Sequence, residues 1–187
     1  MRGKTNPFPS SEFALLGLLF AGPAHGYELH KHITNPKGIG LIWGVRIANL
    51  YAQLAKLESK GWIAGKVQQE EDRPARTQFH LTGDGKKAFT DWITRLVMHP
   101  RDFRQEFMLR YYFLARYNPE LIQDVCSRQL QQCHDWLENT RRKQDIEEVD
   151  SFTRSVIEFR VSQIKSMVDW IEWLMANPPT ILQGEKL

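Results

Sequence analysis

The residues of this chain that are best suited to chemistry are basic and polar side chains within a stretch of about thirty residues. Guanidinium and ammonium groups bind phosphates, whereas an asparagine amide can bond the edge of a base. This chemistry favours a contact with duplex DNA. The candidate residues are Arg46, Asn49, Tyr51, Lys56, Lys66, Arg73 and Arg76.

Other kinds of chemistry find little support. His25, His30 and His32 are close in the sequence, but none is four residues from another, the spacing that puts two metal ligands on one helix face. No Ser/His/Asp set, paired carboxylates or phosphate-binding loop stands out. We therefore expect no metal, no cofactor and no enzymatic activity.

The charge is unevenly distributed along the chain. Residues 1–98 carry 13 Lys and Arg against 8 Asp and Glu, a net of +5, and residues 99–187 carry a net of −2. The basic half is the candidate for an anionic partner.

Three helices are predicted before residue 61. The first begins after Pro9 with Ser10 as its cap and is apolar on most sides, the second spans about 26–34, and the third spans about 45–60. A loop at 35–40 joins the second to the third. In the third helix Leu50, Leu54 and Leu57 form one inward stripe. The opposite face is small and polar, and includes Asn49 and Lys56.

After the stop signal Gly61 the pattern changes to two short strands, 62–69 and 77–81, which form a hairpin around a polar turn. Thr82 can cap a fourth helix that carries Trp92. This order of elements predicts a winged helix-turn-helix. Two alternatives stay open: Tyr51 packs between helices instead of contacting DNA, and the turn is a solvated segment of mixed charge.

Pro100 marks the predicted boundary between a DNA-binding domain, 1–99, and a helical dimerisation domain, 100–187. Helices are expected at 103–117, 119–145 and 151–175. The fold class is therefore mainly α with a small β-hairpin. A seven-residue apolar repeat in the last helix requires a lengthwise helical partner, in the same subunit or in a second one. Its residues, assigned to dimerisation, are Ile157, Val161, Ile164, Val168 and Ile171.

Two further patterns concern the environment of the chain. Cys126 and Cys133 lie seven residues apart in one helical stretch, too far for an internal disulfide, so buried thiols are favoured over a redox pair. No apolar run is long enough to cross a bilayer, and no secretory cleavage pattern is found. We expect no membrane association and a cytoplasmic protein.

Residues 11–90 resemble the PadR family of bacterial transcriptional regulators. The matching segments are LLGLLFAGPAHGYEL, NLYAQLAKLESKGWI and the hairpin RPARTQFHLTGDGKKAF. The segment EFMLRYYFLARYNP is similar to the start of the longer C-terminal domain of one branch. The resemblance implies that Tyr51 contacts the DNA backbone. The chain departs from the family at Arg46–Asn49, where a Ser/Gly/Thr pattern is usual, and this affects the expected sequence preference.

Together these patterns predict a homodimeric, sequence-specific regulator, a repressor, that binds double-stranded DNA at an inverted-repeat operator. The resemblance also implies an aromatic small-molecule effector. We expect its site between the domains or at the dimer interface, lined by Trp92, unless this tryptophan is ordinary core. The alternatives are a winged-helix adaptor that binds proteins without reading DNA, and a ligand carrier or enzyme in the helical domain.

Overall fold

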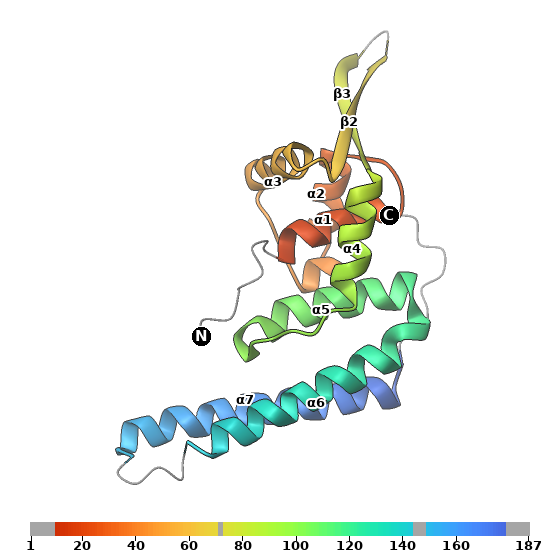
Figure 1. Cartoon of the computed structure of the whole chain (residues 1–187). Helices are drawn as coiled ribbons and strands as arrows, with labels where there is room; N and C mark the ends of the chain where they lie inside the picture. Colours follow the sequence, from red (N-terminus) through yellow and green to blue (C-terminus); the bar gives the residue numbers. More distant parts are fainter. Residues whose placement is uncertain (1–9, 71–72, 144–148, 179–187) are drawn as a thin grey trace.

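The computed structural model describes residues 10–70, 73–143 and 149–178. As predicted, the chain is mainly helical with one small antiparallel sheet (Figure 1). Its elements are α1 Ser10–Phe20, β1 Ala24–His25, α2 Gly26–Thr34, the 3₁₀ turn η1 Gly38–Leu41, α3 Ile47–Ser59, β2 Ile63–Glu70, β3 Arg73–Leu81, α4 Gly83–Ile93, α5 Pro100–Tyr117, the 3₁₀ turn η2 Pro119–Leu121, α6 Ile122–Arg141 and α7 Ser151–Ala176.

Helix α1 lies at the centre of the N-terminal half. It is buried from Ser11 to Leu19, as expected for a helix that is apolar on most sides. Ser10 is its first residue rather than its cap. Glu12 is buried with the apolar side chains, at 1% exposure.

Helices α2 and α3 form the helix-turn-helix. The predicted inward stripe of α3 is confirmed, because Leu50, Leu54 and Leu57 are each 0% exposed. Gly61 ends the helix as predicted. Its φ of 69° is a left-handed conformation that favours glycine, and its amide donates to the Glu58 carbonyl at 2.8 Å.

The sheet has three strands in the order β1-β3-β2, one more than predicted. The added strand β1 has only two residues, Ala24 and His25, which pair with Phe79 and Gln78 of β3. Strands β2 and β3 also extend further than predicted, so Arg76 lies within a strand and not in the turn. A mixed-charge sequence without apolar alternation hid this extension.

Helix α4 is capped as predicted. The Thr82 hydroxyl accepts a hydrogen bond from the Gly85 amide at 3.1 Å. The helix ends at Ile93, and Leu96 and Val97 lie in the segment before α5. Gln129 of α6 holds this segment, with its side chain bonded to the amide and the carbonyl of Val97 at 2.8 and 3.2 Å.

Helix α5 joins the two halves of the chain. The Phe113 ring lies directly over Gly17 of α1, where an added Cβ would be 2.5 Å from ring carbons. The Tyr117 hydroxyl donates to the Gly17 carbonyl at 2.9 Å. Buried hydrophobic residues form one cluster that extends from Phe13 to Leu174. The predicted boundary at residues 99 and 100 therefore does not interrupt the core.

Helices α6 and α7 pair lengthwise below α5 (Figure 1). The apolar repeat of α7 is buried in this pairing, at exposures of 0 to 8%. This corrects the assignment of Ile157, Val161, Ile164, Val168 and Ile171 to a subunit interface, because their lengthwise partner is α6 of the same chain. The start of α6 also differs from the prediction: Pro119 begins a 3₁₀ turn, and the α-helix begins at Ile122.

Both thiols are buried, as predicted, and burial raises the pKa of Cys126 and of Cys133 to about 11. A thiol with so high a pKa is a poor nucleophile. Within the described residues, no helix is long and apolar enough to span a bilayer, and no three His, Cys, Asp or Glu side chains are grouped to hold a metal ion.

Candidate nucleic-acid interface

The outer face of α3 carries three of the predicted DNA-binding residues in exposed positions: Arg46, Asn49 and Tyr51. Arg46 is the N-cap residue, and its side chain makes no capping bond. Ala48 and Ala52 are also exposed, so the backbone of α3 can approach another surface closely. The prediction of a small, polar outer face is confirmed.

Tyr51 is held against the first turn of α2. Its ring lies over Gly26, where an added Cβ would be 2.7 Å from the nearest ring carbon. The side chain remains 47% exposed. Tyr51 thus packs between helices and also presents an edge to solvent, so the two interpretations of this residue are compatible.

His25, one of the three histidines considered above as metal ligands, has a structural role. His25 precedes α2, and its amide donates to the Glu28 carboxylate at 2.7 Å. Its ring Nδ1 lies 3.1 Å from the Thr77 carbonyl of β3. His25 therefore links the helix-turn-helix to the hairpin.

Lys56 differs most from the prediction. It is on the exposed side of α3, but its ammonium group pairs with Oε1 of the buried Glu12 of α1. Lys60 pairs with the other oxygen of the same carboxylate at 2.7 Å. The sequence prediction of Lys56 as a phosphate ligand missed this partner, which lies 44 residues away.

The hairpin β2–β3 projects from the body at the end of the molecule where α3 lies (Figure 1). Lys66 pairs with Gln78, and Gln68 with Arg76, so these four side chains share one face. Lys66 and Arg76 are both exposed. The side chain of Arg73 lies outside the described residues.

The base of the hairpin is fixed to the end of α3. The Glu58 carboxylate accepts a hydrogen bond from the Gly65 amide of β2 at 2.8 Å. A basic strand face and an exposed helix face are thereby held in one arrangement, which suits simultaneous contact with a groove and with neighbouring phosphates.

Trp92, the predicted effector residue, is fully buried at 0% exposure. Its ring stacks on Phe13 at a centroid distance of 5.0 Å, and the Arg110 guanidinium lies 5.2 Å from its centroid. Arg110 donates to Glu106 and to the Arg95 carbonyl. Desolvation lowers the pKa of Arg110 to about 10, against the opposing effect of Glu106. Trp92 is therefore a core residue in this structure.

Three buried polar atoms near α5 have no hydrogen-bond partner among the described residues: Trp92 Nε1, Arg110 Nε and the Tyr111 hydroxyl. Burial raises the pKa of Tyr111 to about 12. Buried polar groups are usually paired, so each of these three atoms is unusual in a core.

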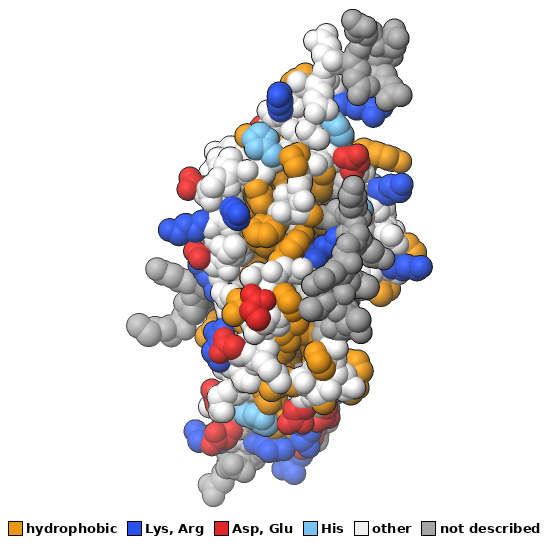
Figure 2. Space-filling model, turned by 90° about the vertical axis from the view of Figure 1, so that its right-hand side faces the viewer, with side chains coloured by type: hydrophobic (Ala, Val, Ile, Leu, Met, Phe, Trp, Pro, Cys, Tyr) orange, Lys and Arg blue, Asp and Glu red, His pale blue; other side chains and the backbone are white. Residues whose placement is uncertain are grey.

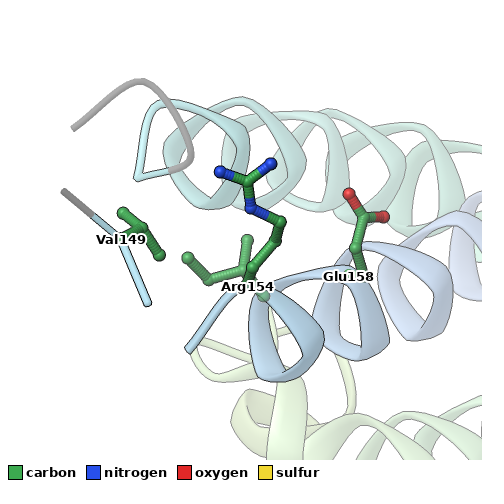
Figure 3. Close-up of a pocket in the computed structure, with 4 residues that line it drawn as sticks. Val149, Arg154 and Glu158 are labelled. Carbon is green, nitrogen blue, oxygen red and sulfur yellow. The ribbon is translucent and has the colours of Figure 1, made fainter. Parts of the chain in front are cut away.

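A separate cavity of about 230 Å³ lies at the start of α7, lined by Val149, Arg154, Ile157 and Glu158. Figure 3 shows the Arg154 and Glu158 side chains directed to the same side of the helix. This cavity is at the end of the α6–α7 pair remote from the hairpin (Figure 1), and it takes no part in the interface described above.

Comparisons with known proteins match both halves of the chain. Residues 15–91 match the model of the transcriptional regulator PadR-like family, and residues 103–177 match that of the virulence activator alpha C-terminal domain. The negative transcriptional regulator PadR of Bacillus subtilis (strain 168) is 28% identical over 120 residues, which are 64% of this chain and 65% of that protein. The chain thus spans about two thirds of this relative.

Similar solved structures include Bacillus subtilis PadR in complex with operator DNA, at 24% identity and a TM-score of 0.48, covering 91% of this chain and 98% of that one. Another is the same protein in complex with p-coumaric acid, at 23% identity and a TM-score of 0.43, covering 90% of this chain and 98% of that one.

Proposed function

The chain belongs to the PadR-like family of transcriptional regulators, and from this premise we propose that it is a homodimeric, sequence-specific repressor. The observation that carries the proposal is the arrangement of α3 and the hairpin. The exposed face of α3 and the basic face of β2–β3 lie at one end of the molecule and are joined by the bond from Gly65 to Glu58.

Helix α3 has the properties of a recognition helix. A major groove about 12 Å wide admits one helix. Ala48 and Ala52 leave room for close approach, and the Asn49 amide can form paired bonds with an adenine edge. Tyr51 and Arg46, on the flanks, are suited to phosphates.

The hairpin supplies contacts that do not depend on base sequence. Lys66 and Arg76 face the same way and are exposed. Each phosphate that such a cation neutralises contributes about 0.9 to the slope of log affinity against log salt concentration. Arg73 is proposed to add to this set at the tip. Repression is favoured over activation because the curated relative is named a negative regulator.

The proposed dimer uses the outer side of α7. With the inner stripe buried on α6, this helix still exposes Phe152, Phe159 and Trp173, at 76, 62 and 57%. These residues are seven and fourteen positions apart and so lie along one stripe. Further hydrophobic side chains gather along the middle of the face shown in Figure 2, which is the right-hand side of Figure 1. A second copy of the chain would cover this stripe and present two copies of α3 to an inverted repeat.

We also propose that an aromatic small molecule modulates DNA binding at the junction of α4 and α5. The unpaired buried Nε atoms of Trp92 and Arg110 support this site, since the Arg110 guanidinium lies over the Trp92 ring and a ligand with a carboxylate or hydroxyl could bond both. The core must open to admit it, because Trp92 is 0% exposed. p-Coumaric acid serves as a probe: it should quench tryptophan fluorescence and lower DNA affinity, both less in Trp92→Phe.

Fluorescence anisotropy with duplexes selected from a random pool tests the central proposal. Arg76→Ala should weaken binding to every duplex and reduce the salt slope by about 0.9. Asn49→Ala should instead reduce the preference for the selected sequence. Arg160→Ala, which removes the same charge from an exposed site on α7, is the matched control. If the wild-type chain binds no duplex even at low salt, the adaptor alternative replaces this proposal.

A further inference from the structure

We propose that Glu12 is a positioning residue for DNA recognition, which fixes the orientation of α3 and restrains Lys56 and the following Lys60 from indiscriminate phosphate binding. The inference rests on the proposed function, because it assigns a role within DNA binding. It begins from a buried carboxylate in the central helix, at 1% exposure, among apolar neighbours.

Both oxygens of this carboxylate are bound by α3 and the residue that follows it. Lys56 pairs with Oε1, and Lys60 pairs with Oε2 at 2.7 Å. A buried carboxylate without partners is strongly unfavourable, so the two lysines are held where Glu12 requires them. They are four residues apart and therefore lie on one side of the helix, one turn from each other.

These ion pairs fix the rotation of α3 about its axis, which the leucine stripe alone leaves adjustable. Contacts of Leu50, Leu54 and Leu57 are apolar and non-directional, and tolerate small rotations of the helix. A carboxylate that binds two ammonium groups is directional, and it sets the rotation of α3 about its axis. In the proposed complex, that rotation decides whether Asn49 points into the groove.

The pairs also limit the charge that α3 offers to DNA. The Lys56 side chain is 49% exposed and the Lys60 side chain 20%, so both can be reached from solvent. Lys60 is further placed by its contact with the Trp62 ring, at 5.0 Å. Without the Glu12 charge, the balance of attraction at both ammonium groups shifts toward phosphates of any sequence.

The test compares wild-type chain with Glu12→Gln, which keeps the shape of the side chain and removes its charge. Affinities are measured over a range of salt concentrations for a duplex selected by the wild-type chain and for a scrambled duplex. Glu12→Gln should bind the scrambled duplex more tightly, with a salt slope steeper by about 0.9 for each lysine that reaches a phosphate. The ratio of the two affinities should fall at least about fivefold, the discrimination that one base contact supplies.

Lys60→Gln provides a second variant, in which Glu12 keeps Lys56 as its partner. It should lower the affinity ratio without steepening the salt slope. Circular dichroism shows whether each variant folds. If Glu12→Gln does not fold, the ratio of the Lys60→Gln affinities for the selected and scrambled duplexes tests the inference. A folded Glu12→Gln with an unchanged ratio and slope, or a Lys60→Gln with an unchanged ratio, would overturn the inference. If the wild-type chain selects no duplex, the proposed function itself fails.

Discussion

The two apolar stripes of α7 can be separated by placing the same charge on each. Ile164→Asp puts a carboxylate on the inner stripe, where the native side chain is 2% exposed, and Phe159→Asp puts one on the outer stripe, where it is 62% exposed. If the inner stripe packs on α6 and the outer stripe packs on a second subunit, Ile164→Asp should destabilise the fold of each subunit, whereas Phe159→Asp should prevent dimerisation.

The expected effects differ in size as well as in kind. Truncation of a buried isoleucine costs about 2–5 kcal/mol, and an unpaired buried carboxylate adds to this. That is a large part of the roughly 5–15 kcal/mol that stabilises a folded protein. A substitution at an exposed site usually changes the unfolding free energy of the subunit by less than about 0.5 kcal/mol.

Urea denaturation and sedimentation equilibrium measure the two quantities. Ile164→Asp should lower the urea midpoint strongly, whereas Phe159→Asp should yield folded monomers. Because dissociation itself lowers the stability of a dimer, the midpoints are compared at protein concentrations where wild type is also monomeric. Lys165→Asp, an exposed site on another side of α7, should change neither quantity. If Ile164→Asp gives stable, folded monomers, the inner stripe is an interface between subunits and the reasoning is refuted.

Three further changes probe other parts of the molecule. Gly26→Ala should displace the Tyr51 ring, 2.7 Å from the new methyl, and weaken DNA binding about fivefold, as loss of one hydrogen bond would; an unchanged anisotropy titration would contradict this. Thr82→Ala removes the cap of α4 and should cost about 1 kcal/mol in urea denaturation, with no change if the cap is dispensable. Since burial raises the thiol pKa of Cys126 and Cys133 from 9.0 to about 11, the folded state holds these protons more tightly. The unfolding free energy should therefore fall as pH rises through that interval, and a double Cys→Ala variant should show a smaller fall.

Features encoded by neighbouring residues were predictable from the sequence. The leucine spacing of α3 indicated the buried and outer faces of that helix. Thr82 indicated the start of α4, and Gly61 indicated the end of α3. Each depends on helical periodicity or on a cap, which act within a few residues. The positions of Arg46 and Asn49 on the outer face follow directly.

Features that depend on distant pairing were missed. The two residues of β1 carry no strand pattern, and only their pairing with β3 makes them a strand. The partner of the α7 repeat was open, since a heptad requires a helix but does not identify it. Lys56 looked available because Glu12 is remote in sequence. A carboxylate in an otherwise apolar helix was the available signal, as it requires a cationic partner.

The bare backbone of Gly17 beneath the Phe113 ring has a consequence for the spacing of operator half-sites. In the proposed dimer, the path from α7 to α3 passes from Trp170 to the aromatic rings of α5, then through α1. Every step of that path is a packing contact between helices, and none depends on a flexible linker. The volumes of the packed side chains therefore determine the distance between the two recognition helices. A larger residue at position 17 would tilt α5 and, in the proposed dimer, shift both recognition helices together, so related regulators could acquire new half-site spacings through the core while their DNA-reading residues stay the same.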